Sequence, residues 1–467
     1  MNSSASPTKN EGGWKDRPAG LPNGVPPPSV PLSFLAAAAV GLVACGLALV
    51  KVRAYAVTNP TNDQVVGAAH FALLATLSMG VLGAIHQFTP VITQKPLRSI
   101  LISRGTFFSW LLGSWLLPIG FMSQREAVVE GGGVFAAVAV ALFVFNIAPP
   151  LTARASGASA TGLRLAVIGF VVTACYGVVY VIDRKGGWFD LSGHVVLAHA
   201  CVGLLAWLGL AYLSVSEKLW PMFMLAHVPG RHPSAWLSVW SLFIGVALLS
   251  PGLLFGASWL AMSGASIVTL GFAAHGYSLV TYLHHRRRSI DLHLWFVLSS
   301  ALWLLVAIGL AVAGDVMIRH HHHLGVSLVA ATVSALAGWL LVAIVGHSYK
   351  IVPFIVWSAL RGRGVSRNAE GSPLAFADLF NHRWSTVDFV VVNGAVAALC
   401  LGFATSTSIL IGIGGSLLTV TGLVTVSNLA WRPMKYLYRS DTTTVDHPLA
   451  PIRQPATLRA KGGTTGN

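Results

Sequence analysis

Residues 65–86 read VVGAAHFALLATLSMGVLGAIH, a run of 22 residues without a single Asp, Glu, Lys or Arg. About 20 consecutive apolar residues are enough for a helix to cross the hydrocarbon core of a bilayer. The same run carries His70 about five residues after its start and His86 at its end. The stretch therefore predicts a transmembrane helix with titratable side chains, which are costly inside a membrane and usually functional.

The composition of the whole chain agrees with this segment. Of the 467 residues, 54% are apolar and 10% are charged, whereas about a quarter are charged in an average soluble domain. The mean hydropathy is +0.70. So few charged side chains exclude a cytosolic enzyme, a disulfide scaffold and a disordered chain. The formal charge of +15 comes from basic residues that punctuate the hydrophobic runs, as membrane topology signals do, so we expect no nucleic-acid partner.

Similar apolar runs recur along the chain and predict an all-α polytopic membrane protein with 12 transmembrane helices in residues 31–440. The flanking segments 1–30 and 441–467 are expected to be disordered cytoplasmic tails. The division between the seventh and eighth spans depends on a very short connection. The predicted spans are 31–51, 65–86, 100–122, 133–151, 163–183, 192–215, 235–256, 258–284, 292–314, 323–348, 385–405 and 407–430.

The distribution of basic residues predicts the direction of insertion. With an even number of spans, both termini lie on one side, and the segments on that side carry 24 of the 30 Lys and Arg residues. This asymmetry follows the positive-inside rule, so both termini are expected in the cytoplasm. The six basic residues on the other side are Lys51, Arg53, Arg125, Arg184, Lys185 and Arg319.

An internal repeat is visible at the cytoplasmic ends of the even-numbered spans. Lys218 and Pro221 follow Trp207 by 11 and 14 residues, and Lys350 and Pro353 follow Trp339 by the same intervals. Proline commonly ends helices and lysine commonly marks cytoplasmic ends, which accounts for part of the similarity. The shared spacing four helices apart predicts a fold built from four-helix units.

Histidine is the polar residue that recurs at one depth of the predicted membrane domain. His70 in the second span, His194 and His199 in the sixth, and His320 to His323 before the tenth all fall in the outer third of the bilayer. Neutral imidazole ligates haem iron and copper well. His194 and His199 are about 140° apart around a helix, so they cannot easily hold one metal together. The structural alternative for His70 is a hydrogen bond to a neighbouring carbonyl, and for His320 to His323 it is an exposed loop with adventitious metal affinity.

The remaining titratable groups carry weaker predictions. His275 in the eighth span is a further candidate for metal binding. His86 and His347 are expected at the inner lipid headgroup layer, with a second site as the alternative, and His293 is expected in solvent. No Asp or Glu is expected deep in a span, with Asp388 the closest exception. The four cysteines, Cys45, Cys175, Cys201 and Cys400, lie in apolar runs and are expected to be buried and unpaired.

Twelve spans, a four-helix repeat and histidines at one level of the second, sixth and tenth helices resemble subunit I of the haem-copper oxidases and nitric oxide reductases. The stretches from His70 to Pro90, from Gly203 to His227 and from Gly338 to Trp357 carry this likeness. The chain also resembles the NnrS-type membrane proteins, which are twelve-span, histidine-rich and linked to nitric oxide tolerance.

The resemblance implies a role for several of these histidines. The helix 2 histidine of the superfamily is an axial ligand of a low-spin haem, a role that falls on His70. The helix 10 pair supplies further haem ligands, which map within His320–His323 and give His321 and His323 as candidates. The helix 6 histidine binds the non-haem metal, which points to His199, and we add His194 and His275 as alternative metal ligands. The implied cofactors are haem and, as a second metal, copper or another ion.

Departures from the superfamily pattern weaken the copper site. The outer end of the seventh span reads SPGLLF at 250–255 without the usual pair of histidines, and Gly203 stands where a tyrosine is expected. We therefore expect a haem-binding protein of a bacterial cytoplasmic membrane, in respiratory electron transfer or in the response to oxygen or nitric oxide, with an incomplete copper site. The open alternatives are a non-haem twelve-span transporter and an active oxidase or reductase completed by a partner subunit. No Cys-x-x-Cys-His motif is present, so electrons would come from a lipid-soluble donor or another protein.

Overall fold

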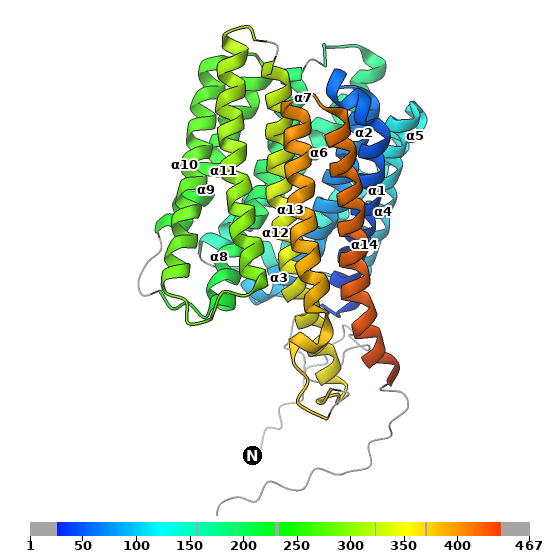
Figure 1. The fold of residues 1–467 in the computed structure, drawn as a ribbon, viewed down its shortest axis with the longest axis vertical. Helices are drawn as coiled ribbons and strands as arrows, with labels where there is room; N and C mark the ends of the chain where they lie inside the picture. Colours follow the sequence, from blue (N-terminus) through cyan, green and yellow to red (C-terminus); the bar gives the residue numbers. More distant parts are fainter. Residues whose placement is uncertain are drawn as a thin grey trace, which may run out of the picture.

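The computed structural model describes residues 26–439, apart from 156, 192, 229–232, 323 and 369–370. Helices make up nearly all of this part of the chain, and no strand occurs in it (Figure 1). The predicted tails lie almost wholly outside the described residues. The helices are α1 (Ser29–Thr58), α2 (Asp63–His70), η1 (Phe71–Ser78), α3 (Met79–Thr93), α4 (Ile100–Ser123), α5 (Glu126–Leu151), α6 (Ala158–Gly186), α7 (Gly193–Cys201), η2 (Val202–Gly209), α8 (Leu210–Met224), α9 (Pro233–Leu254), α10 (Ser258–His284), α11 (Leu292–Arg319), α12 (Leu324–Gly362), η3 (Phe376–Leu379), α13 (His382–Ala404) and α14 (Ser408–Arg439).

Eleven helical segments in the described residues are long and apolar enough to cross a membrane. Two of them are composite, because α2, η1 and α3 form one segment over 63–93 and α7, η2 and α8 form another over 193–224. The predicted eighth span corresponds to α10, a separate 27-residue helix that packs along α9 but is not among the eleven. Its serines, threonines and a central histidine lower its hydropathy. The chain is thus an all-α, polytopic membrane protein.

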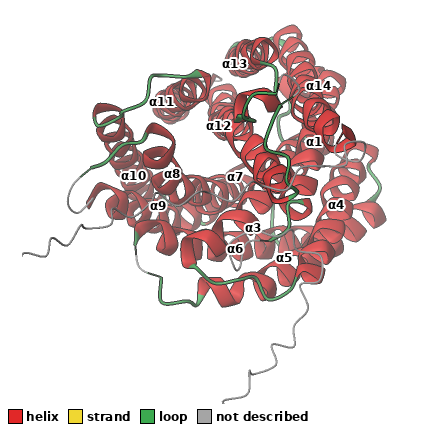
Figure 2. Cartoon of the chain, turned by 90° about the horizontal axis from the view of Figure 1, so that it is seen from below, coloured by secondary structure: helices red, strands yellow, loops and turns green. Residues whose placement is uncertain are grey.

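The second, sixth and tenth of the predicted spans meet inside the bundle. The segments 63–93 and 193–224 are the most enclosed, with 67% and 61% of their apolar windows buried, against 28% for α5, α6 and α11. Segments η1 and η2 contact each other, and both contact α12. Viewed from below, α7 and α12 lie toward the middle, with α4, α5, α9, α10 and α11 around them (Figure 2).

The repeat is most evident between the second and sixth spans. Each contains a π-helical segment of eight residues, η1 or η2, followed by a 15-residue α-helix with proline at its twelfth position, Pro90 or Pro221. The prolines do not end these helices, and α12 likewise continues to Gly362 beyond Pro353. Turns of π-helix are rare and often mark functional sites. The sequence prediction paired the sixth span with the tenth through their Trp-to-Lys-to-Pro spacing. Among the described residues, however, the helical structure of the sixth span resembles that of the second span more closely.

Two glycines let neighbouring helices approach the π segments. A Cβ atom on Gly41 of α1 would lie 2.2 Å from the carbonyl oxygen of Ala75 in η1. A Cβ atom on Gly169 of α6 would lie 2.3 Å from the carbonyl oxygen of Ala206 in η2. Because only glycine fits against a backbone carbonyl at this distance, the first span packs on the second in the same way as the fifth packs on the sixth.

Candidate functional site

The candidate site lies toward the upper end of the bundle in Figure 1, where α2 and α7 begin. His70 is the last residue of α2, directly before η1, and His199 lies three residues before η2 begins. Their imidazole rings are nearly parallel, at 20°, with ring centroids 6.5 Å apart. The two π-containing spans therefore bring the two predicted ligands together, from helices 129 residues apart in the sequence.

The orientation of His70 is fixed by its own helix. Its Nδ1 atom lies 2.7 Å from the carbonyl oxygen of Val66, one turn earlier. A carbonyl oxygen carries no proton, so Nδ1–H is the donor and Nε2 of the neutral ring keeps its lone pair. This is the usual arrangement of a metal-ligating histidine, in which one nitrogen is held by a backbone carbonyl and the other faces the metal.

Aromatic side chains enclose the pair. Phe121 of α4 packs 5.3 Å from the His70 ring, and Tyr176 and Tyr180 of α6 lie 6.2 and 5.7 Å from the His199 ring. Nδ1 of His199 is buried and has no hydrogen-bond partner. The indole Nε1 of Trp115, whose ring packs 5.5 Å from that of Phe71, is also buried without a partner. Buried polar atoms without partners are rare in native proteins, so the unpartnered Nδ1 of His199 is consistent with a ligand bound beside the pair.

The backbone of α7 is held by hydrogen bonds from α6 and α9. The Tyr180 hydroxyl donates to the carbonyl of Val195 at 2.7 Å. Ser250 donates to the carbonyl of Ala198 at 3.2 Å, and its oxygen lies 2.9 Å from the Tyr176 hydroxyl. These contacts hold the turn of helix that carries His199.

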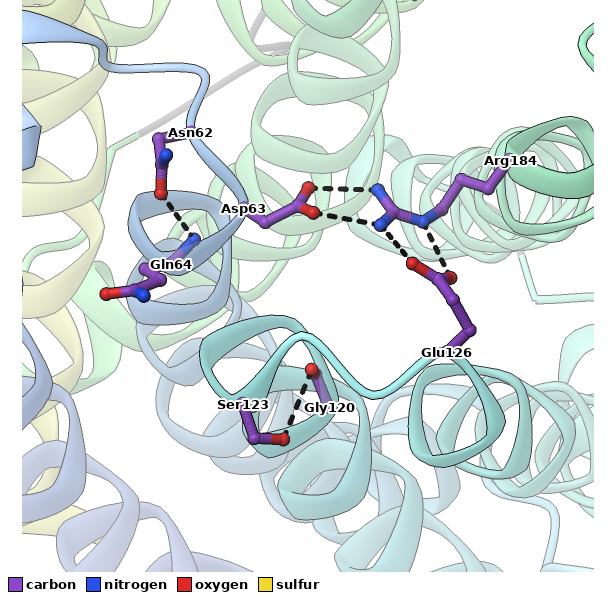
Figure 3. Close-up of polar contacts among 7 residues, drawn as sticks. All are labelled: Asn62, Asp63, Gln64, Gly120, Ser123, Glu126 and Arg184. Atoms are coloured by element: carbon purple, nitrogen blue, oxygen red, sulfur yellow. Dashed lines mark hydrogen bonds and ion pairs between the residues drawn. The ribbon is translucent and has the colours of Figure 1, made fainter.

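An ion cluster lies beside the pair at the same end. Arg184, in the last turn of α6, makes two 2.9 Å hydrogen bonds to the Asp63 carboxylate and bonds of 2.9 and 2.5 Å to Glu126 (Figure 3). Its guanidinium carbon lies 5.3 Å from the centre of the Phe121 ring. Asp63 and Glu126 are the first residues of α2 and α5, so one arginine ties three helix ends together, with bidentate geometry to both carboxylates. The sequence prediction treated Arg184 as a topology signal and missed this role, although the pattern of acids opening two spans and an arginine closing a third is visible in the sequence.

The spacing of the two rings fits a pair of ligands on opposite sides of one metal centre. A metal–imidazole bond is about 2.0 Å and the ring centre lies about 1.1 Å farther, so two opposed ligands have centroids about 6.2 Å apart. The observed value is 6.5 Å. No group of three or more His, Cys, Asp or Glu side chains that could hold a metal ion occurs among the described residues. The pair supplies two imidazoles, and a haem iron takes at most two axial ligands from a protein.

The other predicted ligands lie away from this pair. His194 is exposed and donates from Nδ1 to the carbonyl of Leu253 at 3.0 Å, which ties α7 to α9. His320, His321 and His322 are exposed in the turn between α11 and α12, His321 with φ at 53°. His323 lies outside the described residues. The assignment of haem ligands to His321 and His323 stays a prediction, and α12 itself begins at Leu324.

His275 lies in the lower half of the bundle, where it meets a buried carboxylate. Its Nδ1 is 3.6 Å from Oε1 of Glu217 in α8, and the Tyr282 hydroxyl donates to Oε2 of the same carboxylate at 2.8 Å. The Trp220 ring packs 4.6 Å from the imidazole. Both His275 and Glu217 are buried.

Several sequence expectations about this lower half need correction. Glu217 and Asp388 are both buried within spans, and Asp388 accepts hydrogen bonds from Tyr349 at 2.8 Å and Thr425 at 2.6 Å. The spans continue past the predicted inner boundaries, so residues assigned to the membrane surface lie inside the bundle. For the same reason His86 and His347 are buried rather than at headgroups. His293 stands at the predicted inner end of its span and is buried beside Phe223 and His347 rather than in solvent. Of the four unpaired cysteines, Cys175 is exposed on the bundle surface.

No protein-family model matches this chain, and no curated protein matches it either. The function of this chain is therefore inferred from the geometry of the site.

Proposed function

We propose that this chain is a haem-binding integral membrane protein of the haem-copper oxidase superfamily type, acting in respiratory electron transfer or in the response to oxygen or nitric oxide. The observation that carries the proposal is the His70–His199 pair, with parallel rings 6.5 Å apart inside an aromatic shell. His70 and His199 would be the axial ligands, in place of the superfamily's pairing of helix 2 with helix 10.

Each residue of the site has a physical task in this proposal. The Val66 carbonyl orients the His70 ring and makes its Nε2 the ligating atom. Tyr180 and Ser250 hold the backbone beside His199, while Phe121 and Tyr176 keep water away from the pair. Haem bound here would supply one-electron redox chemistry. Held by both imidazoles, the group would serve electron transfer rather than catalysis on a gas.

The arrangement of the bundle supports the superfamily likeness. The second, sixth and tenth predicted spans contact one another through η1, η2 and α12. With α10 counted as a span, the bundle has the twelve helices of that superfamily, with both termini on the cytoplasmic side of a bacterial inner membrane. The outer part of the seventh span lacks the copper-binding histidines of the superfamily. Ser250 lies there and has a structural role, because it hydrogen-bonds to Tyr176 and to the carbonyl of Ala198. If the protein is an enzyme, it is an oxidoreductase that needs a partner subunit to complete its second metal site.

The test is the reduced-minus-oxidised optical spectrum of the purified, detergent-solubilised chain. We expect a Soret band that is lost in His70→Ala and in His199→Ala. The matched control is His194→Ala, because His194 lies in the same helix as His199 but is exposed. A monodisperse wild-type preparation without haem would refute the proposal. Oxygen or nitric oxide consumption by the same preparation would instead favour the active oxidase or reductase.

One observation favours the non-haem transporter as a second candidate function. Glu217 and Asp388 are intramembrane carboxylates, and such groups commonly belong to ion and proton pathways. The wild-type chain in proteoliposomes that contain a pH-sensitive dye would then carry protons under a potassium diffusion potential. Glu217→Gln or Asp388→Asn would abolish that flux, whereas His194→Ala would not.

A further inference from the structure

We propose that His293 and His347 form a second site, in the lower half of the bundle, that binds one first-row transition-metal ion such as Zn²⁺ or Cu²⁺. His293 is the second residue of α11, and His347 lies in the middle of α12. Both side chains are more than nine-tenths buried, and the Nε2 atom of each is buried without a hydrogen-bond partner. This site is independent of the His70–His199 pair and of the haem proposed there.

The lone pair of His347 is directed by its own helix. Nδ1 of His347 donates to the carbonyl of Ala343 at 2.7 Å, so Nε2 of the neutral ring is an acceptor that meets no donor. Leaving such an atom unpaired in the interior costs about 1–3 kcal/mol. Two such atoms on adjacent rings therefore indicate a site for a bound ligand.

The two rings have the geometry of neighbouring ligands on one ion. Their centroids are 4.8 Å apart and their planes are inclined at 83°. With each centroid about 3.1 Å from a metal, ligands at 90–109° would have centroids about 4.4–5.1 Å apart. Imidazole is a good ligand for Zn, Cu, Fe and Ni. The surrounding rings of Phe223 and Tyr212 lie 5.1 Å from His293 and 5.9 Å from His347 and supply no competing donor at the nitrogen atoms.

A small cavity adjoins His293. This cavity of about 10 Å³, large enough for one water-sized particle, is lined by His293 and by Ser289, Asp291 and Arg288 of the preceding loop. Asp291 is paired at 2.5 Å with Lys350, three residues after His347. The ion pair thus joins the start of α11 to α12 at the mouth of the site. Since no third His, Cys, Asp or Glu side chain joins the pair among the described residues, water or an exogenous ligand would take the remaining coordination positions.

The test measures metal content in the full-length chain in detergent. After treatment with a chelator, the protein is loaded with Zn²⁺, passed over a desalting column with a weak chelator to clear surface histidines, and analysed by inductively coupled plasma mass spectrometry. We expect one zinc ion per wild-type chain and a loss of at least tenfold in occupancy in His293→Gln and His347→Gln. The matched control is His285→Gln, because His285 is exposed at the same end of the bundle and should leave occupancy unchanged.

A measurement on the wild-type chain alone covers the case in which a variant fails to fold. X-ray absorption at the zinc edge should show two imidazole ligands at about 2.0 Å. No retained zinc in a monodisperse wild-type preparation would overturn the proposal and leave water as the occupant. Equal zinc in the wild type and both variants would overturn it as well. The Soret band provides a separate readout, because loss of this band in His347→Gln would make that histidine a haem ligand instead.

Discussion

Replacing Gly169 with alanine tests whether the two π-containing spans are packed as equivalent units. The new methyl group would lie 2.3 Å from the Ala206 carbonyl oxygen, far inside any van der Waals contact. Because the obstructing atom belongs to the backbone, no rotamer change relieves the overlap, and η2 must move away from α6. Overpacking of this kind costs about 1–3 kcal/mol. Gly41→Ala places its methyl group 2.2 Å from Ala75 and should cost the same.

The control for both variants is Gly133→Ala in α5, where an added Cβ meets nothing within 4 Å. All three changes gain about 1 kcal/mol of helix propensity, so the difference from the control isolates the packing cost. Equilibrium unfolding in mixed micelles can be followed by tryptophan fluorescence. The free energy of unfolding of Gly169→Ala and of Gly41→Ala should be about 1–3 kcal/mol lower than that of Gly133→Ala. Haem retention should fall in the same two variants, since η1 and η2 adjoin His70 and His199. If Gly169→Ala unfolds like the control, the packing argument is refuted; if only one of the two tests is destabilised, the spans are not equivalent.

Three further outcomes follow from the contacts at the two ends of the bundle. Arg184→Gln should lower the thermal midpoint of unfolding in detergent, because Asp63 and Glu126 lose their shared cation. Arg125→Gln removes a charge that forms no ion pair within the described residues and should change the midpoint little, so an equal midpoint for both variants would contradict the role of the cluster. In right-side-out vesicles, Arg319→Cys should react with an impermeant maleimide added outside, whereas His285→Cys should react only after permeabilisation. The reverse pattern would overturn the predicted orientation. Asp388→Leu should lower the free energy of unfolding by about 1–3 kcal/mol, because Tyr349 and Thr425 lose their acceptor between α12, α13 and α14. Asp388→Asn should lower it less, and equal free energies of unfolding for the two variants would refute that account.

The fold class could be predicted from the sequence because hydropathy alone constrains it. An apolar run of about 20 residues has few alternatives to a helix in a membrane, since its backbone groups must be paired within the segment. Even the short connection after Leu254 separates α9 from α10 as expected. The π segments could not be predicted in this way, because an added residue per turn leaves hydropathy unchanged. Their consequence, the close packing of Gly41 and Gly169, depends on backbone geometry that composition does not record.

The candidate site was predicted in part. His70 and His199 were selected by depth, and depth is what the sequence encodes through the position of each residue within its span. Which of several residues at one depth face each other depends on helix rotation and neighbours, so His194 could not be separated from His199 until its bond to Leu253 was seen. The lower cluster was missed because the tenth span was expected to end at residue 348, whereas α12 continues to Gly362. His293 stands at the predicted inner end of its span, and its burial depends on packing against His347 and Phe223, which hydropathy does not record.

The two histidine pairs differ in how the fold produces them, and this bears on their roles. His70 and His199 come from the two spans that each contain a π-helical segment. Their rings lie nearly parallel where these spans approach each other through η1 and η2. Both side chains are half-buried and are flanked by Phe121, Tyr176 and Tyr180. His293 and His347 come from consecutive helices, close to the Asp291–Lys350 ion pair at the lower surface. The proposed lower site therefore adjoins an ion pair at one end of the bundle, whereas the His70–His199 pair lies at the other end, so the two proposed sites would bind and release their ligands independently.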